Sequence, residues 1–405
     1  MRKSELTREK QRLLWEAWGY VKVVFICQTP YHLFNSLYYA TFLKKYNINS
    51  IIINDSDKEY EGVEFEDKKI VKVHSEKKTK LSNLNEGYFF WKKNNHIKVL
   101  LTNIELVVCF NDQTNCSAKV IEFCKKHNNA KIALIEDGCG IYNEERKNVT
   151  IKKIVKKFLF GSVIVKQLGK NRYIDIIVSK DPKLLPKWIT RNRELLQQQD
   201  VFEDKKFINS FLYKNEYLEE LEKTIRSKKV ILFLGQPVSE LGIDESNQIA
   251  FLKKIATELS EYIIVVKPHP RDADNKYVNL ANLSNIIIYE NKLWYPAEVL
   301  SYVLHPIAAI SVCSSATESF LAIGNSVVIY LYDMLGVKLE NTYINASRYK
   351  KGIFFPENFR DVVTVIKNIS NCVVDQCSKC NIESGDTFIE YIKEMVEGNI
   401  KNDIC

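Results

Sequence analysis

Three short motifs place a carboxylate, an imidazole and two hydroxyl groups where they could meet a ligand. The motifs are Glu136-Asp137-Gly138, Lys267-Pro268-His269-Pro270 and Ser314-Ser315. Each follows a run of mostly apolar, β-branched residues that predicts a buried strand. These runs are Lys131–Ile135, Ile263–Val266 and Ile307–Val312. Because ligands of open α/β sheets bind outside the carboxyl ends of the strands, the motifs predict an acid–base and phosphate-binding site.

Asp137 is the candidate general base of this site. A carboxylate at a strand end, partly removed from water, can take the proton of a sugar hydroxyl. Gly138 and Gly140 let the backbone turn sharply and bring the carboxylate close to a ligand. The alternative is a turn or helix-capping residue, which is the common use of an Asp-Gly pair.

His269 is the candidate group for a leaving phosphate. Pro268 and Pro270 stiffen its loop, and Lys267 makes the loop electropositive. A departing phosphate needs a hydrogen bond or a proton as its bond breaks, and an imidazole can supply either. The alternative is an ordinary turn histidine, since a second His-Pro pair begins at His305, where a helix is expected to end.

Ser314 and Ser315 lie between a predicted strand and a predicted helix. Serine is a preferred N-cap, and a helix N-terminus also binds phosphate, so the structural and the functional interpretation share one geometry. Glu298, in Pro296-Ala297-Glu298 at the start of another helix, could accept hydrogen bonds from both hydroxyls of a ribose. It could equally be a first-turn glutamate that favours the helix dipole.

Two further loops follow predicted strands. Gly235 and Gln236 are expected on the nucleotide side, and the acidic Glu240, Asp244 and Glu245 that follow could reach the ligand. The loop after the first strand is expected to hold an acceptor sugar. Its residues are Gln28, Thr29, Pro30, Tyr31 and His32. The alternative for this loop is simple capping of a helix by threonine, with proline at the first helical position.

No metal ion or other cofactor is expected. Asp55-Ser56-Asp57 has the letters of an Asp-x-Asp metal motif and follows a strand, but it is a weak exception. Cys372, Cys377 and Cys380 lie close together, yet a zinc site needs a fourth ligand and no histidine lies nearby. The sequence contains neither a Walker loop nor a GxGxxG motif.

Strand-like runs alternate with helical patterns in two series, at the spacing of βαβ units. The expected parts are an N-terminal extension at 1–20, an acceptor-side Rossmann-like domain at 21–194, a helical linker at 195–228, a nucleotide-side Rossmann-like domain at 229–370 and a tail with a helix at 371–405. The tail helix could cross back onto the first domain. This organisation predicts the α/β architecture called GT-B, in which two parallel sheets face a central cleft.

The composition of the chain limits the classes of partner and the compartment that we expect for it. The 405 residues are 46% hydrophobic and 27% charged, with a net charge of +8. No apolar run approaches the roughly 18–20 residues of a spanning helix, and the charged start does not resemble a signal peptide. Free thiols in a reducing cytoplasm are therefore expected for the ten cysteines. Nucleic acid is not expected as a partner, because no known recognition motif is present.

The stretch Ile151–Leu159 combines an apolar face with a lysine-rich face. Such a basic amphipathic helix is typical of binding to an anionic membrane surface. It predicts a cytoplasmic protein that lies peripherally on the inner membrane and acts on a lipid-linked glycan. A surface helix with a solvated lysine face is the alternative.

The ordered motifs Glu-Asp-Gly, His-Pro and Ser-Ser resemble the motif set of bacterial sialyltransferases. The opening Phe25-Ile26-Cys27-Gln28-Thr29-Pro30-Tyr31-His32-Leu33 resembles glycosyltransferase family 52, which includes lipooligosaccharide sialyltransferases. The resemblance runs from about Val21 to Tyr330. It implies a GT-B, inverting, metal-independent enzyme that moves sialic acid from CMP-sialic acid to a terminal sugar, galactose being expected, of a surface glycan or glycolipid.

By the same resemblance, Asp137 is the base, His269 assists the departure of CMP, and the remaining nucleotide contacts come from the second half of the chain. Those contacts are Gly235, Gln236, Lys267, Pro270, Glu298, Ser314 and Ser315. In family 52 the base could instead come from Glu240, Asp244 or Glu245. Three other functions stay open: a GT-B enzyme with another nucleotide-sugar donor, a nucleotide-sugar epimerase, and a non-catalytic glycan-binding protein. The oligomeric state is also open, with a homodimer among the options.

Overall fold

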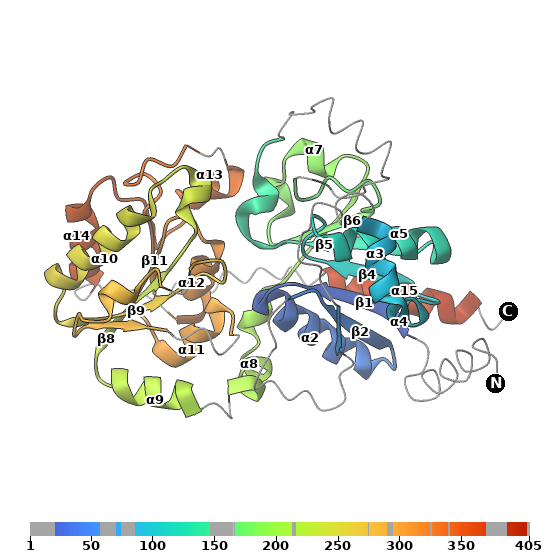
Figure 1. Ribbon diagram of the computed structural model, residues 1–405, viewed down its shortest axis with the longest axis horizontal. Helices are drawn as coiled ribbons and strands as arrows, with labels where there is room; N and C mark the ends of the chain where they lie inside the picture. The colour runs from blue at the N-terminus through green and yellow to red at the C-terminus, as the bar shows by residue number, and fades with distance from the viewer. Residues whose placement is uncertain are drawn as a thin grey trace. The chain divides into compact units, whose positions relative to one another are not determined.

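The chain forms two compact α/β units (Figure 1). The computed structural model describes residues 21–56, 70–73, 86–145, 165, 167–212, 216–273, 275–289, 295–324, 326–338, 341–369 and 387–402. The first unit holds the described residues up to Gln199 together with the C-terminal helix. The second unit holds the described residues from Asp200 to Ile369.

The described residues of the first unit contain a seven-stranded parallel sheet of order β3-β2-β1-β4-β5-β6-β7. The strands are β1 Val21–Cys27, β2 Asn49–Asn54, β3 Ile70–Lys72, β4 Leu106–Cys109, β5 Lys131–Ile135, β6 Ile176–Ser179 and β7 Glu194–Gln197. The strands β4 and β6 are buried along their whole length, which explains their mostly apolar sequences. The strand order reverses between β1 and β4, the place where open sheets of this kind bind ligands.

Helices and short 3₁₀ turns connect these strands. They are α2 Pro30–Lys45, α3 Glu86–Lys93, α4 Asn95–Leu100, α5 Asn115–Asn128, η1 Gly138–Tyr142, η2 Pro182–Leu184, α7 Lys187–Thr190 and α15 Thr387–Asn402. Helix α2 begins as its sequence allows, because the Thr29 hydroxyl accepts the His32 N–H at 3.3 Å and Pro30 occupies the first turn. Capping is therefore a structural task of Thr29 and Pro30.

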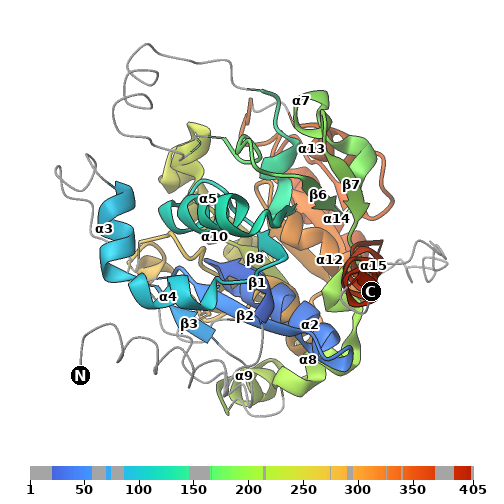
Figure 2. The ribbon, with the colours of Figure 1, turned by 90° about the vertical axis from the view of Figure 1, so that its right-hand side faces the viewer.

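The C-terminal helix α15 returns to the first unit and packs beside β7 (Figure 2). The Thr387 hydroxyl accepts the Gln197 N–H at 2.7 Å and donates to the Gln197 carbonyl at 3.2 Å. Phe388 is fully buried, with its ring edge-on to Tyr39 of α2 at a centroid distance of 5.2 Å. The tail thus completes the core of the first unit.

The first residues of the expected helical linker form a strand instead. Residues Leu195–Gln197 belong to β7, which pairs in parallel with β6. This pairing satisfies backbone groups that β6 would otherwise expose at the sheet edge, so the tertiary contact overrides a weak helical pattern. The helices of this stretch, α8 Lys205–Leu212 and α9 Glu216–Ile225, belong to the second unit.

The described residues of the second unit contain a six-stranded parallel sheet of order β10-β9-β8-β11-β12-β13. The strands are β8 Lys229–Leu234, β9 Tyr262–Lys267, β10 Ile286–Ile288, β11 Ala308–Ser311, β12 Val327–Tyr330 and β13 Ile353–Phe354. The strand order reverses between β8 and β11, which marks the equivalent ligand position of this sheet.

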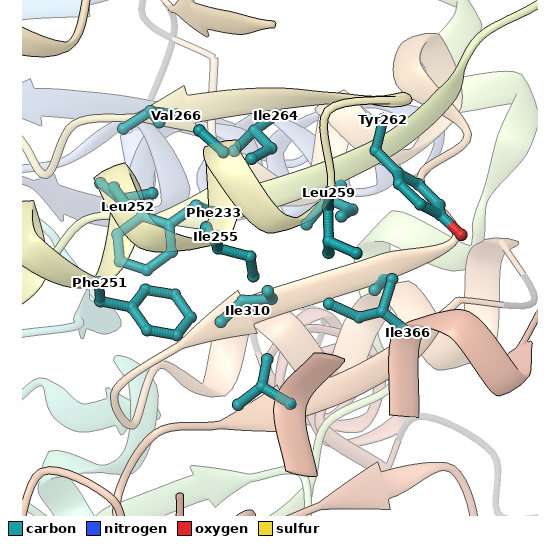
Figure 3. Close-up of a cluster of buried hydrophobic side chains, with 14 of the residues drawn as sticks. Phe233, Phe251, Leu252, Ile255, Leu259, Tyr262, Ile264, Val266, Ile310 and Ile366 are labelled. Atoms are coloured by element: carbon teal, nitrogen blue, oxygen red, sulfur yellow. The ribbon is translucent and has the colours of Figure 1, made fainter. Parts of the chain in front are cut away.

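The remaining helical segments of the second unit are mostly short. They are η3 Val201–Glu203, η4 Val238–Leu241, α10 Glu245–Glu258, η5 Val278–Leu280, η6 Ala297–Val299, α11 Leu300–Leu304, η7 Ser315–Glu318, α12 Ser319–Gly324, α13 Thr342–Ser347 and α14 Phe359–Ile369. Apolar side chains of α10 and α14 pack with those of the sheet into one core (Figure 3). Within the described part of the chain, no helix is long and apolar enough to cross a membrane.

The packing of α15 can be tested with Phe388→Ala. Removing a fully buried ring should lower the free energy of unfolding of the first unit by about 3–5 kcal/mol. Denaturant unfolding combined with hydrogen exchange should show the loss in β1 and β7 but not in β8. Glu390→Ala, at an exposed position of the same helix, is the matched control and should change stability by less than about 0.5 kcal/mol. Equal effects of the two variants would contradict the docked position of α15.

Candidate functional site

Asp137 follows the buried strand β5 and precedes the turn η1, as its sequence predicts. Gly138 has a φ of 67°, a left-handed conformation that favours glycine and lets the chain turn at this point. The neighbouring Glu136 is internal: its carboxylate accepts the Tyr142 O–H at 2.6 Å and the Lys180 N–H at 2.8 Å. Burial and the Glu136 carboxylate raise the pKa of Tyr142. Asp137 is therefore the carboxylate of this motif that faces outward, with its side chain 34% exposed.

Asp137 is in contact with a histidine from another strand end. Its Oδ2 lies 3.0 Å from Nε2 of His32, whose side chain is fully buried. The Gln28 N–H donates to Nδ1 of the same imidazole at 3.1 Å. The imidazole also stacks on Phe110, which follows β4, with 4.6 Å between ring centroids. The ends of β1, β4 and β5 thus meet around His32.

Of the other residues expected on the acceptor side, some have structural roles and one is partly exposed. The Gln28 side chain donates to the Ser117 hydroxyl at 3.2 Å and approaches Asp55 Oδ2 at 3.5 Å. Tyr31 is partly exposed beside Phe110, whereas Thr29 and Pro30 start helix α2.

Asp55 belongs to the weak Asp-x-Asp candidate, whose second aspartate, at 57, lies outside the described residues. Within the described residues, no group of three or more histidine, cysteine, aspartate or glutamate side chains could hold a metal ion.

In the second unit, the loop after β9 is organised by Asp272. This carboxylate has a side chain only 2% exposed, and it accepts the His269 N–H at 2.9 Å and the Tyr277 O–H at 3.1 Å. The Lys276 ammonium, also nearly buried, donates to it at 2.8 Å. The cation balances the negative charge of this buried carboxylate, and the two neutral donors supply further hydrogen bonds to it. These bonds hold the loop in one conformation.

The hydrogen bonding and the pKa of His269 define which of its two ring nitrogens carries a proton. The Arg271 N–H donates to Nδ1 at 3.1 Å, so the proton of the neutral imidazole is on Nε2. Burial and the neighbouring cations Arg271 and Lys267 lower the pKa of His269 to about 4. At neutral pH, His269 is therefore an uncharged hydrogen-bond donor at Nε2 in an electropositive loop.

Gly235 and Gln236 support this loop from the end of β8. A side chain at Gly235 would collide with the Tyr277 hydroxyl and approach Asp272 Oδ2 to 2.9 Å, which explains the glycine. The Gln236 carbonyl accepts from Lys276 Nζ at 2.8 Å, and its side-chain oxygen accepts the Cys313 N–H at 2.8 Å. Gln236 thus ties the ends of β8 and β11 together.

The two serines lie just beyond β11. The Ser314 N–H donates to the Ser311 hydroxyl at 3.0 Å, and the Ser314 carbonyl accepts the Thr317 N–H at 3.1 Å. Ser314 makes no side-chain cap, and the expected helix from Ser315 opens as the 3₁₀ turn η7 before α12 continues it. The serine hydroxyls are thus not needed to cap this turn.

Three other expected donor residues surround the same end of the sheet. Lys267 is nearly buried, with its ammonium 5.3 Å from the ring centroid of Tyr289. Pro270 is exposed next to His269. Glu298 is 5% exposed in the turn η6, where its carbonyl accepts the Ser301 hydroxyl at 2.6 Å.

The three acidic residues considered as alternative bases have structural partners. Glu240 pairs on the surface with Arg271 at 2.6 Å. Asp244 caps α10 by accepting the Ser246 N–H at 2.8 Å. Hydrogen bonds with the side chain and the backbone of Ser246 lower the pKa of Asp244. Burial raises the pKa of Glu245, but Lys276 at 2.5 Å and Ser239 together hold it below the ordinary value.

Asp272, Lys276 and Tyr277 were not among the residues predicted from the sequence. The spacing of Asp272 and Lys276 is that of an ion pair one turn apart, which is the available sequence signal. The basic stretch Ile151–Leu159 and the cysteine group from Cys372 to Cys380 lie outside the described residues, so predictions about them stay predictions.

Solved structures share this fold at low sequence identity. A candidate UDP-N-acetylglucosamine 2-epimerase from Listeria monocytogenes matches with a TM-score of 0.62 and 13% identity, over 95% of this chain and 97% of that chain. The wall teichoic acid polymerase TagF, as an H444N variant, matches with a TM-score of 0.57 and 15% identity, over 99% and 96%. The UDP-GlcNAc 2-epimerase of Neisseria meningitidis, bound to UDP-GlcNAc, matches with a TM-score of 0.58 and 11% identity, over 87% and 92%.

These likenesses show the fold, which is the expected GT-B architecture of two parallel-sheet α/β domains. No curated protein matches the chain by sequence. The sequence profile of glycosyltransferase family 52 matches residues 68–334, about two thirds of the 405 residues, including Asp137, His269 and both serines. The chain therefore belongs to glycosyltransferase family 52.

Proposed function

We propose that this glycosyltransferase moves sialic acid from CMP-sialic acid to a terminal sugar, with galactose expected, of a lipooligosaccharide or another surface glycan. The observation that carries the proposal is the His269 loop, found in a member of family 52. A neutral imidazole with its proton on Nε2 projects from a basic loop at the strand end that follows β9. CMP-sialic acid carries one phosphate, and a single neutral donor flanked by cations suits a single leaving phosphate.

In the proposed reaction, a hydroxyl oxygen of the acceptor forms a bond to the anomeric carbon of sialic acid. The bond from that carbon to the phosphate oxygen breaks, and its electron pair leaves with CMP. Nε2–H of His269 donates to the phosphate as charge builds there, and Asp137 takes the hydroxyl proton. Attack on the face opposite to the leaving group inverts the anomeric centre.

Asp137 suits the role of base better than its three acidic competitors. Its carboxylate is exposed enough to meet a ligand and stands at the end of a buried strand. Glu240, Asp244 and Glu245 are each engaged by an arginine, a helix start or a lysine.

The donor is tested by incubating the protein with CMP-sialic acid, UDP-sugars and GDP-sugars, with and without a galactoside. We expect CMP release from CMP-sialic acid, accelerated by the galactoside. Release of UDP or GDP, without CMP, would mean another donor. Conversion of UDP-GlcNAc to its 2-epimer would instead favour the activity named for several proteins that share the fold.

The role of His269 predicts a large loss of turnover in His269→Ala. The kcat should fall by about 10²–10⁴, the usual contribution of a group that assists proton or charge transfer. Binding of CMP, measured by calorimetry, should change far less. Turnover close to that of the wild type would make His269 an ordinary turn residue.

The pKa of His269 also predicts a pH dependence. In the unfolded chain a histidine takes up its proton near pH 6.5, but in the folded protein His269 does so only near pH 4. The stability contributed by neutral His269 is therefore present above pH 6.5 and is lost as the pH falls toward 4. NMR of the imidazole should show a midpoint near 4 that rises when CMP binds, because the phosphate is an anion. A midpoint near 6.5 in the free protein would contradict the buried, cation-flanked site.

The role of Asp137 predicts that Asp137→Asn abolishes transfer while folding and CMP binding persist. Glu240→Gln, Asp244→Asn and Glu245→Gln serve as matched controls and should retain most of the kcat. An active Asp137→Asn variant combined with an inactive control variant would move the base to that control position.

We also propose that transfer needs no divalent metal, since the phosphate has His269 and nearby cations as partners. Activity should survive an excess of EDTA. Loss of activity that magnesium or manganese restores would revive Asp55 and Asp57 as ligands. We also propose a cytoplasmic protein that binds an anionic membrane surface, because Ile151–Leu159 has the pattern of a basic amphipathic helix and the chain has a net charge of +8.

A further inference from the structure

We infer that His32 is the positioning residue of Asp137: its Nε2–H holds the carboxylate in place for proton transfer. The inference rests on the proposed role of Asp137 as the base. It assigns to His32 a task different from sugar binding, because the His32 side chain is fully buried and cannot touch a ligand. Asp137 is the member of the pair that a ligand can reach.

The backbone around β1 sets the tautomer of His32. The Gln28 N–H donates to Nδ1 at 3.1 Å, so Nδ1 must carry a lone pair. The proton of the neutral ring is then on Nε2, the nitrogen that lies 3.0 Å from Asp137 Oδ2. One hydrogen bond to the main chain thus places the other, protonated nitrogen beside the carboxylate.

The ring is held rigidly in this orientation. The His32 N–H donates to Thr29 in the first turn of α2, which anchors the backbone. The imidazole lies parallel to Phe110, with 8° between the ring planes. A buried aromatic stack together with the bond to Nδ1 leaves the ring little freedom to rotate.

Burial makes the contact with Asp137 necessary. An N–H group removed from water costs free energy unless it finds an acceptor. The Asp137 carboxylate lies 3.0 Å from His32 Nε2, although the N–H is not aligned with Oδ2 in this structure, so a small rotation of either side chain completes the hydrogen bond. In the reaction, the hydroxyl proton moves to Asp137, and His32 keeps its own proton throughout.

The experiment uses two substitutions that each keep one half of the imidazole. His32→Gln can retain a donor near the position of Nε2 but loses the acceptor for Gln28. His32→Asn can retain that acceptor near the position of Nδ1 but cannot reach Asp137. Both variants are compared with the wild type for melting temperature, CMP affinity, kcat and acceptor KM. The donor used is the nucleotide sugar that the wild type accepts, so the ranking does not depend on its identity.

We expect His32→Gln to keep kcat within about tenfold of the wild type and His32→Asn to lose about 10²-fold, with CMP affinity unchanged in both. Better activity of His32→Asn would show that His32 only anchors the loop. Equal activities, whether both normal or both lost, would likewise overturn the inference.

A second experiment, by NMR, tests the contact between His32 and Asp137 without measuring any activity. In protein labelled with ¹⁵N-histidine, the shifts should identify His32 as the Nε2–H tautomer, with a downfield and exchange-protected proton. Asp137→Asn should move that signal upfield, whereas Glu122→Gln, in a surface pair on α5, should not. A tautomer protonated at Nδ1, or a signal that ignores Asp137→Asn, would refute the contact even if the donor assay succeeds.

Discussion

The geometry of the His269 loop depends on the hydrogen bonds and the ion pair of one buried carboxylate, that of Asp272. Its charge is compensated by the Lys276 ammonium, the His269 N–H and the Tyr277 O–H, and each of these bonds fixes a different part of the site. The bond from Lys276 fixes that side chain, which also donates to the Gln236 carbonyl. The bond from the His269 N–H holds the backbone of the loop. The bond from the Tyr277 hydroxyl keeps that side chain next to Gly235, where only glycine fits. A charge that must be satisfied inside the protein thus turns a proline-rich loop into a rigid support.

The first unit applies the same principle with different groups. There a neutral, buried His32 is fixed by a main-chain donor and an aromatic stack, and it faces a carboxylate that is partly exposed. In each unit a buried side chain holds a neighbouring residue in position, and that neighbour, Asp137 or His269, is the residue proposed to take part in the reaction. This division of tasks lets residues on loops be held in defined positions by buried neighbours.

The sequence predicted the long buried strands and the residues at their ends, because apolar runs and turn residues are local signals. It missed β6, a run of only four residues, and the edge strands β7 and β13, whose partly exposed residues form no buried apolar run. Asp137, His32, Gln28 and His269 were all identified as candidates, but their partners were not. The contact of His32 with Asp137 depends on how β1, β4 and β5 lie beside one another, and no local pattern encodes that arrangement. Likewise, nothing near Asp272 in the sequence indicates that its carboxylate is buried.

A crystal structure with CMP bound would show whether the second sheet binds the donor nucleotide through His269. We expect the nucleotide at the carboxyl ends of β8, β9 and β11. Its phosphate should lie within hydrogen-bonding distance of His269 Nε2, with Ser314 and Ser315 beside it. A nucleotide bound at the strand ends of the first unit, or a phosphate held away from the His269 loop, would contradict the proposed role of His269.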